Sequence, residues 1–217
     1  MQKVSRSDFS NERFKWLSAQ NINIGLAPCS AMRVNFVGEL GWELHHPIEY
    51  QNHIFDQLMQ AGKEFGLKPY GIRAMNSLRV EKSYKLVGTE LSIEYSPYES
   101  GLDRFVHPNK GDFIGRAALD KWRAKGFSNK LVTMEIHGVT DADVLGNNPI
   151  YDNGSVVGRA TSGDFGFRLN KSIALGMVKP ELAKVGQKLK IDILGKMHEA
   201  SIVEESPYDS ENKLLRA

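Results

Sequence analysis

Residues 35–46 read Asn-Phe-Val-Gly-Glu-Leu-Gly-Trp-Glu-Leu-His-His, and this stretch decides how the chain is interpreted. Two carboxylates, Glu39 and Glu43, lie four residues apart in a strand-like segment that glycines interrupt. Successive side chains alternate between the two faces of a regular strand, so Glu39, Leu40 and Glu43 would not all point the same way. A β-bulge at Gly41 would re-aim one of them.

Two interpretations of this segment are open from the residues alone. A pteridine ring requires a flat apolar surface, backbone that approaches closely, and a carboxylate that pairs with the N–H donors of the ring. Glycine permits the close approach because it has no side chain. The same spacing is equally typical of a glycine-interrupted strand whose carboxylates are solvated.

The size and composition are those of an ordinary globular protein. A chain of 217 residues holds one large domain or two small ones, each able to bury a core. Hydrophobic residues make up 41% and charged residues 25% of it. The net charge is only +2, and no block of like charges occurs, so we do not expect nucleic-acid binding.

The sequence shows no signal for a membrane or for an oxidising compartment. No apolar run approaches the ~18 residues of a membrane span, and the first residues lack the apolar core of a signal peptide. Cys29 is the single cysteine, which excludes an intrachain disulfide and a cysteine-based zinc site. We interpret it as a bystander rather than a nucleophile, and we predict a cytoplasmic location.

The first part of the chain is predicted to be α+β. The first 30 residues are interpreted as connecting structure, and the alternation over residues 32–37 predicts a half-buried strand. Helical periodicity and flanking stop signals predict three helices, over residues 47–63, 70–85 and 114–125.

After residue 128 the apolar period changes to two. Alternating residues predict strands over 131–136, 150–151, 156–157, 189–193 and 197–203. Asn153-Gly154 is a strong hairpin signal between two of them. Several short strands with closely spaced turns predict a small barrel or sandwich. We therefore divide the chain into an α+β part, residues 1–126, and an all-β part, residues 127–217.

Further blocks show a resemblance to a known family. With residues 35–46, they are GIRAMNSLRVEK (71–82), PYESGL (97–102), GRATSG (158–163) and IALG (173–176). They resemble, in order and over nearly the whole chain, the aminomethyltransferase (glycine cleavage T-protein) family. The likeness is closest to the folate-binding region that follows the flavin domain in dimethylglycine and sarcosine dehydrogenases. The resemblance implies a partial folate-binding domain followed by a small carboxy-terminal antiparallel β-barrel.

The resemblance also assigns folate-binding residues within the signature. Glu43 matches the second signature glutamate, which accepts N–H donors from the pterin edge. Hydrogen bonds to an ionised acceptor are roughly twice as strong as neutral ones. Leu44 and His45 are expected to line the same wall of the site. Glu39 matches the first signature glutamate, and both loop support and direct contact are open for it.

Two further assignments depart in part from the family. Phe36 stands where relatives usually have tyrosine, so stacking area is kept while a phenolic hydrogen bond is lost. Arg79 matches the arginine of the family's S-L-R-L-E core, and an ion pair with Glu81 or Glu99 is its structural alternative. Met75 replaces an arginine of the glycine cleavage enzymes, so that folate contact is not transferred.

Outside these residues the chemical signals are weak. Tyr98, Glu99 and Arg104 lie in a loop whose family counterpart passes near the ligand. Tyr208 either reaches back towards the ligand or belongs to an exposed tail. No two histidines have the i, i+4 spacing of a helical metal site, so we assign no metal ligand and no catalytic residue.

The reaction implied by the resemblance is transfer of a methylene unit from a methylamine to tetrahydrofolate. The protein would contribute positioning and electrostatic stabilisation. The family's catalytic aspartate lies in the half of the domain before the region that this chain matches. FAD is expected as a cofactor only if a separate dehydrogenase domain is present. We therefore expect the chain alone to be catalytically incomplete.

Partners and alternatives follow from that expectation. The site is completed by a flavoprotein, by a complementary chain or by a second copy, and an exposed edge near residues 30–40 predicts self-association. One alternative is a non-enzymatic folate-binding protein, but the lysine-glycine-cysteine-tyrosine signature of such relatives does not match Ala-Pro-Cys-Ser around Cys29. The other is an interaction module completed by a partner chain.

Overall fold

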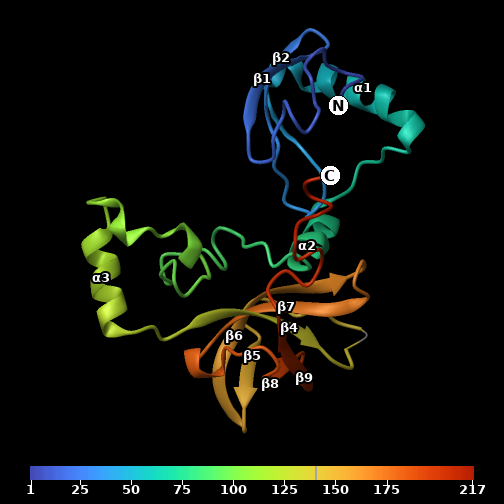
Figure 1. The fold of residues 1–217 in the computed structure, drawn as a ribbon. Coiled ribbons are helices and arrows are strands. Elements are labelled where there is room, and N and C mark those ends of the chain that lie inside the picture. Colours follow the sequence, from blue (N-terminus) through green and yellow to red (C-terminus); the bar gives the residue numbers. More distant parts are fainter. Residues whose placement is uncertain (140) are drawn as a thin grey trace. The chain divides into compact units, whose positions relative to one another are not determined.

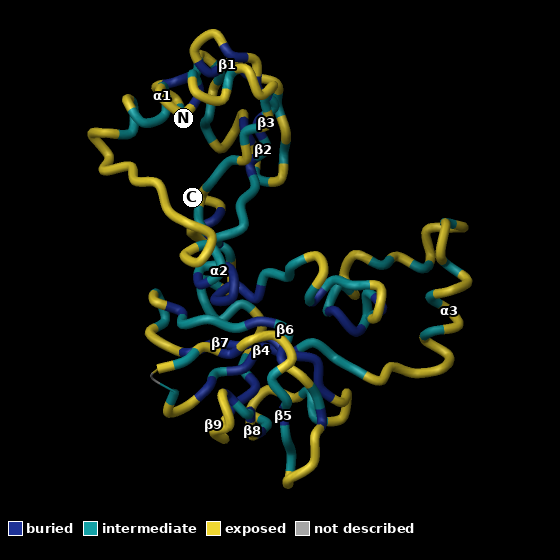
Figure 2. Tube along the Cα trace, turned by 180° about the vertical axis from the view of Figure 1, so that it is seen from behind, coloured by how far each residue is buried: buried dark blue, intermediate teal, exposed yellow. Residues whose placement is uncertain are grey.

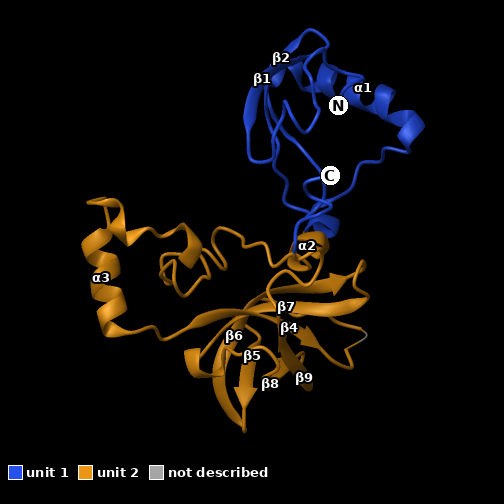
Figure 3. Cartoon of the chain, in the orientation of Figure 1, with its two compact units in different colours: residues 1–75, 211–217 blue, residues 76–210 orange. Residues whose placement is uncertain are grey.

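The computed structural model describes residues 1–139 and 141–217. These residues form two compact units (Figure 3). Unit 1 contains residues 1–75 and 211–217, and unit 2 contains residues 76–210. The domain boundary after residue 126 stays a prediction. The mixture of helices, a sheet and a barrel confirms the predicted α+β class.

Unit 1 contains a three-stranded antiparallel sheet with the order β1-β2-β3. Strands β1 and β2 are labelled in Figure 1, and all three strands are labelled in Figure 2. The strands are β1 (Ala19–Ile24), β2 (Ala27–Met32) and β3 (Glu43–His45). After the 3-10 turn η1 (Ile48–Tyr50) comes helix α1 (Gln51–Gly62). Ile54 of this helix packs with strand residues in one hydrophobic cluster that also includes the fully buried Phe14. This cluster is the core of unit 1.

The β1–β2 hairpin corrects the interpretation of the first 30 residues as connecting structure. Its signal is present in the sequence, because the buried Ile22 and Ile24 alternate with Asn21 and Asn23. Gly25 follows with φ +56°, a conformation that glycine adopts without strain and that tight hairpin turns require.

The strand predicted over residues 32–37 is also wrong, since β2 ends at Met32. The Oδ1 atom of Asn35 accepts the backbone N–H groups of Val37, at 3.0 Å, and of Gly38, at 2.7 Å. Asparagine side chains compete in this way with strand hydrogen bonds and favour turns.

A β-bulge at Gly41, one way in which a side chain of this segment could be re-aimed, is not formed. Residues 33–42 form a loop, and Gly41 precedes the first residue of β3. Glu39 therefore lies in the loop, whereas Glu43 lies on a strand. Pairing of β3 with β2 starts only at Glu43, opposite Met32.

The three predicted helices are present, each shorter than its predicted range. Helix α1 is followed by η2 (Lys63–Phe65), which ends at Gly66, whose φ is +69°. Helix α2 covers Ile72–Val80 rather than residues 70–85. It ends early because the chain turns at Ser83, with φ +55°, and the Tyr84 N–H bonds back to the Arg79 carbonyl. Helix α3 (Arg116–Lys125) has no buried residue and runs at the surface of unit 2 (Figure 2).

Unit 2 contains a closed antiparallel barrel with the strand order β4-β7-β6-β5-β8-β9, which decides between barrel and sandwich. Its strands are β4 (Lys130–Ile136), β5 (Pro149–Asp152), β6 (Ser155–Gly166), β7 (Lys171–Val178), β8 (Lys188–Ile193) and β9 (Lys196–Val203). Short 3-10 turns lie between them and before them, η3 (Asp103–Phe105), η4 (Pro108–Lys110) and η5 (Pro180–Leu182). Asn153 and Gly154 both have positive φ, which confirms the predicted hairpin turn.

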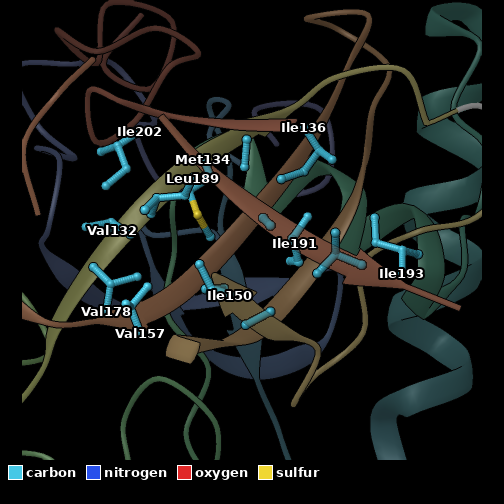
Figure 4. Packing of buried hydrophobic residues seen from close by; sticks show 14 residues of the cluster. Val132, Met134, Ile136, Ile150, Val157, Val178, Leu189, Ile191, Ile193 and Ile202 are labelled. Carbon is cyan, nitrogen blue, oxygen red and sulfur yellow. The ribbon is translucent and has the colours of Figure 1, made fainter. Parts of the chain in front are cut away.

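The barrel interior is filled by aliphatic side chains from all around the ring. Val132, Met134 and Ile136 lie two residues apart on β4 and point inward together (Figure 4). Ile150 and Ile191 meet them from other strands and are fully buried. The period-two pattern in the sequence therefore corresponds to the inner face of the barrel. No helix among the described residues is long and apolar enough to cross a membrane.

Candidate ligand-binding site

Glu43 and His45 form an exposed polar pair on β3. They lie two residues apart, so their side chains share one face of the strand. The Nε2 atom of His45 lies 3.3 Å from the Oε2 atom of Glu43, and the two side chains are 59% and 48% exposed. Leu44 faces the other way and packs against the core of unit 1. Leu44 and His45 therefore lie on opposite faces of this strand, and a role for both in one ligand site stays a prediction.

The loop before β3 is organised by Asn35. Besides the two N–H groups that its Oδ1 atom accepts, its side-chain amide donates to the backbone carbonyl of Glu39. Gly41 passes so close that a Cβ atom there would lie 3.0 Å from the Asn35 Cβ atom. The half-buried Phe36 and Glu39 both belong to this loop. The Asn35 side chain thus contacts several backbone positions of the loop that carries Phe36 and Glu39, two of the predicted residues.

The ends of the loop are held by Arg33 and Trp42. The buried Arg33 guanidinium donates to the carbonyls of Phe14, at 2.7 Å, and of Ala217, at 3.0 Å. It also lies 5.9 Å from the Trp42 ring, in cation–π range. Trp42 meets Phe9 edge to face at 5.5 Å. These contacts connect the start of β3, and hence Glu43, to the hydrophobic core of unit 1.

Sequence reasoning missed Asn35 and Arg33. An asparagine followed three residues later by glycine is a turn signal, because the side chain can cap the backbone and glycine accepts positive φ. That signal was available for Asn35 and Gly38. Nothing comparable marks Arg33, because its partners at Phe14 and Ala217 are distant in the sequence.

Arg79 lies inside unit 2 and forms an ion pair, though not with either predicted partner. Its Nη1 atom lies 3.4 Å from Oε2 of Glu90, and the two side chains are 1% and 0% exposed. The guanidinium also donates to Asn76 Oδ1 at 2.9 Å and to the Tyr84 carbonyl at 3.0 Å. Burial lowers the pKa of Arg79, and the Glu90 carboxylate opposes that shift. Arg79 thus forms the ion pair that was the structural alternative to folate contact, but its partner is Glu90 rather than Glu81 or Glu99.

Two other carboxylates also hold unit 2 together. Glu99 accepts the N–H groups of Ser96, at 3.0 Å, and of Ser128, at 3.2 Å, and so fixes the entry to β4. Glu81 is fully buried and pairs with Arg168.

Tyr208 also packs inside unit 2. The Arg168 guanidinium lies 3.8 Å from the Tyr208 ring, and the backbone N–H of Tyr208 donates to the Glu81 carbonyl at 3.0 Å. Tyr208 is therefore half-buried rather than part of an exposed tail. Tyr98 packs on Phe127 at 5.4 Å, and Arg104 lies over its neighbour Phe105.

The buried carboxylates predict acid-sensitive stability. Burial alone would raise the pKa of Glu90 and of Glu99, but the hydrogen bonds that each accepts outweigh it and lower both pKa values. A depressed pKa in the folded state contributes stability above the unfolded value, about 4.3 for glutamate, and that contribution is lost as the pH falls through the folded pKa. We therefore expect the urea midpoint of unfolding to fall as the pH is lowered below about 4.3.

The control for acid sensitivity is an exposed glutamate in the same unit. Glu99→Gln should flatten the acid limb of the curve of unfolding free energy against pH, whereas Glu181→Gln should leave it unchanged. Equal slopes for wild type and Glu99→Gln would contradict the assignment.

Among residues 1–139 and 141–217, no group of three histidine, cysteine or carboxylate side chains is arranged to hold a metal ion.

Comparison with protein families gives two matches. The model described as "GCVT N-terminal domain" matches residues 1–110, and that described as "Glycine cleavage T-protein C-terminal barrel domain" matches residues 129–209. The barrel strands β4 to β9 lie within the second range.

Curated proteins of two kinds are similar to this chain. It is 39% identical to human "Dimethylglycine dehydrogenase, mitochondrial" over 206 residues, 94% of this chain and 24% of the relative. It is 34% identical to mouse "Sarcosine dehydrogenase, mitochondrial" over 226 residues, 100% of this chain and 24% of that protein. It is 33% identical to an "Aminomethyltransferase" of Desulfitobacterium hafniense (strain DSM 10664 / DCB-2) over 203 residues, 94% of this chain and 54% of the relative. The chain thus spans between a quarter and about half of these relatives.

The fold is similar to that of a solved structure. The crystal structure of glycine cleavage system aminomethyltransferase T from Bartonella henselae matches with a TM-score of 0.76 at 24% identity. The match covers 84% of this chain and 50% of that one. At this identity the likeness shows the fold alone.

Proposed function

This chain belongs to the glycine cleavage T-protein (aminomethyltransferase) family, and from that premise we propose that it binds a reduced folate at the β3 face of unit 1. The observation that carries the proposal is the exposed Glu43 carboxylate, held on a short strand beside the loop of residues 33–42. The chain is also related to the dimethylglycine and sarcosine dehydrogenases.

Glu43 suits the N–H donors of a reduced pterin. A carboxylate has two oxygens and about four lone-pair positions, and His45 contacts only Oε2 at 3.3 Å. The group can therefore accept two adjacent donors while it keeps the histidine contact. Hydrogen bonds to an ionised acceptor are shorter and stronger than neutral ones, which favours the carboxylate as the anchor of the ring.

The neighbouring residues take different parts in the proposed site. His45 shares the exposed face with Glu43 and fixes the carboxylate orientation. Phe36 offers an apolar surface from the loop, and Glu39 supports the loop through its backbone carbonyl. Leu44 does not face the ligand. It packs against the core of unit 1 and so holds β3 in place. Arg79 is not carried into the site, because its side chain is buried against Glu90.

In the complete protein we propose transfer of a one-carbon unit from a methylamine to tetrahydrofolate. Tetrahydrofolate, when bound, supplies the nitrogen that accepts the carbon unit. The residues of this chain bind and orient the pterin, and the negative charge of Glu43 favours a cationic reaction partner beside it. A flavin-bearing or complementary polypeptide would supply the amine oxidation.

The test is a calorimetric titration of the purified chain with 5-formyltetrahydrofolate. We expect micromolar binding, and we expect Glu43→Gln to weaken it at least about tenfold, equivalent to about 1.4 kcal/mol. Glutamine keeps the size of the side chain but offers one neutral acceptor in place of a carboxylate.

The matched control is Glu49→Gln, which changes another exposed glutamate of unit 1, in the turn η1. It should leave the dissociation constant within about twofold of wild type. Equal weakening by both substitutions would indicate a general charge effect. No binding by a folded chain would favour the alternative of an interaction module.

A further inference from the structure

We infer that Asn35 is a positioning residue that holds the loop of residues 33–42 in the conformation that binds the pterin. The inference rests on the proposed folate site. Asn35 does not need to touch the ligand for this role, since it acts through the loop that carries Phe36 and Glu39 and leads into Glu43. Both the oxygen and the nitrogen of its side-chain amide form hydrogen bonds with the loop backbone.

The three hydrogen bonds of Asn35 close the loop on itself. Its oxygen accepts the N–H groups of Val37 and Gly38, at 3.0 and 2.7 Å, and its nitrogen donates to the carbonyl of Glu39. A donor and an acceptor in one rigid amide define the direction of three peptide groups, those between residues 36 and 37, 37 and 38, and 39 and 40. This fixes the backbone on both sides of Gly38, where φ is +76°.

The packing around Asn35 requires this arrangement. Gly41 lies against the asparagine side chain, where a Cβ atom would be only 3.0 Å from Asn35 Cβ. The loop therefore contacts the Asn35 side chain in two places: residues 37–39 form hydrogen bonds with it, and Gly41 packs against it. Phe36, next to Asn35, is half-buried rather than free in solvent. Its ring position consequently depends on the backbone that Asn35 holds.

Loss of the side chain should loosen the loop without unfolding unit 1. Alanine removes the Asn35 partner of two N–H groups and one carbonyl; of these, the N–H of Gly38 belongs to a buried residue, whereas Val37 and Glu39 are half-buried. The hydrophobic core of unit 1 includes neither Asn35 nor Phe36. The substitution is therefore expected to disorder the loop rather than unfold unit 1. A ligand would have to order the loop again on binding, and this weakens its affinity.

The experiment combines amide exchange with folate binding on the same variants. In Asn35→Ala, we expect the backbone amides of Val37 and Gly38 to exchange at least about tenfold faster than in wild type, measured by NMR. We expect the dissociation constant for 5-formyltetrahydrofolate to rise about three- to tenfold. Asn35→Ser keeps a short acceptor beside the same N–H groups, so it should recover most of both losses.

The matched control is Asn52→Ala, an exposed asparagine on α1 of the same unit. It should change neither the exchange of Val37 and Gly38 nor the dissociation constant. Far-UV circular dichroism of each variant shows whether unit 1 keeps its secondary structure.

The outcomes separate this inference from the proposed function. Wild-type binding that Asn35→Ala leaves unchanged would overturn the positioning role and leave the folate site standing. Unchanged exchange of Val37 and Gly38 in Asn35→Ala would overturn it as well. No binding by the wild type, with fast exchange only in Asn35→Ala, would refute the folate proposal while supporting the loop-holding role of Asn35.

Discussion

Replacing Arg79 by methionine is expected to lower the free energy of unfolding of unit 2 by about 3–5 kcal/mol. The substitution leaves the Glu90 carboxylate, whose side chain is 0% exposed, without its cationic partner. Removing one member of a buried ion pair is costly because the remaining charge stays in a low-dielectric environment. Urea unfolding followed by far-UV circular dichroism measures the loss.

The control for this prediction is Arg73→Met on the same helix. Arg73 is exposed, and surface substitutions usually change stability by less than about 0.5 kcal/mol. The contrast separates the buried pair from any general effect of removing an arginine from α2. A loss below about 1 kcal/mol in Arg79→Met would mean that the pair does not carry a buried charge.

Replacing Met134 by alanine is expected to lower the free energy of unfolding by about 2–5 kcal/mol. Met134 is fully buried in the barrel interior (Figure 4). A Cβ atom at Gly176 on the neighbouring strand would lie 3.0 Å from its Cε atom. Truncation removes apolar contacts and leaves a cavity that the closed ring of strands cannot collapse to fill. Thermal and urea unfolding both report the change.

Met197→Ala is the matched control, because Met197 lies on β9 but is 53% exposed. Its loss should stay below about 1 kcal/mol. If the two substitutions destabilise the protein equally, the inward face of the barrel has been assigned wrongly. That result would also argue against the register of β4, because Val132 and Ile136 share the face of Met134.

The sequence alone determined the elements whose signal is local and periodic. Alternating apolar residues identified β4, β8 and β9, and Asn153-Gly154 located a hairpin, since the side-chain period of a strand and the φ of a turn depend on near neighbours. The helices were found for the same reason. The family resemblance, shown by the matching family models, added the closed barrel that periodicity alone left undecided.

The signature segment shows where local reasoning failed. Its alternation predicted a strand, but one asparagine side chain bonds to the backbone N–H groups that a strand would pair. Position 25 shows the reverse error, because Gly25 belongs to a hairpin turn although the first 30 residues were predicted to be connecting structure. In both cases the deciding feature was turn chemistry rather than hydrophobic period.

The polar interior depended on tertiary structure alone. The structural alternative for Arg79 was an ion pair with Glu81 or Glu99, yet its partner is Glu90. Arg33 likewise bonds to carbonyls at residues 14 and 217. Composition and spacing determine which segments alternate as strands and which residues form turns. They do not fix which buried charges meet, because that depends on how distant segments pack, and burial then makes each such pairing obligatory.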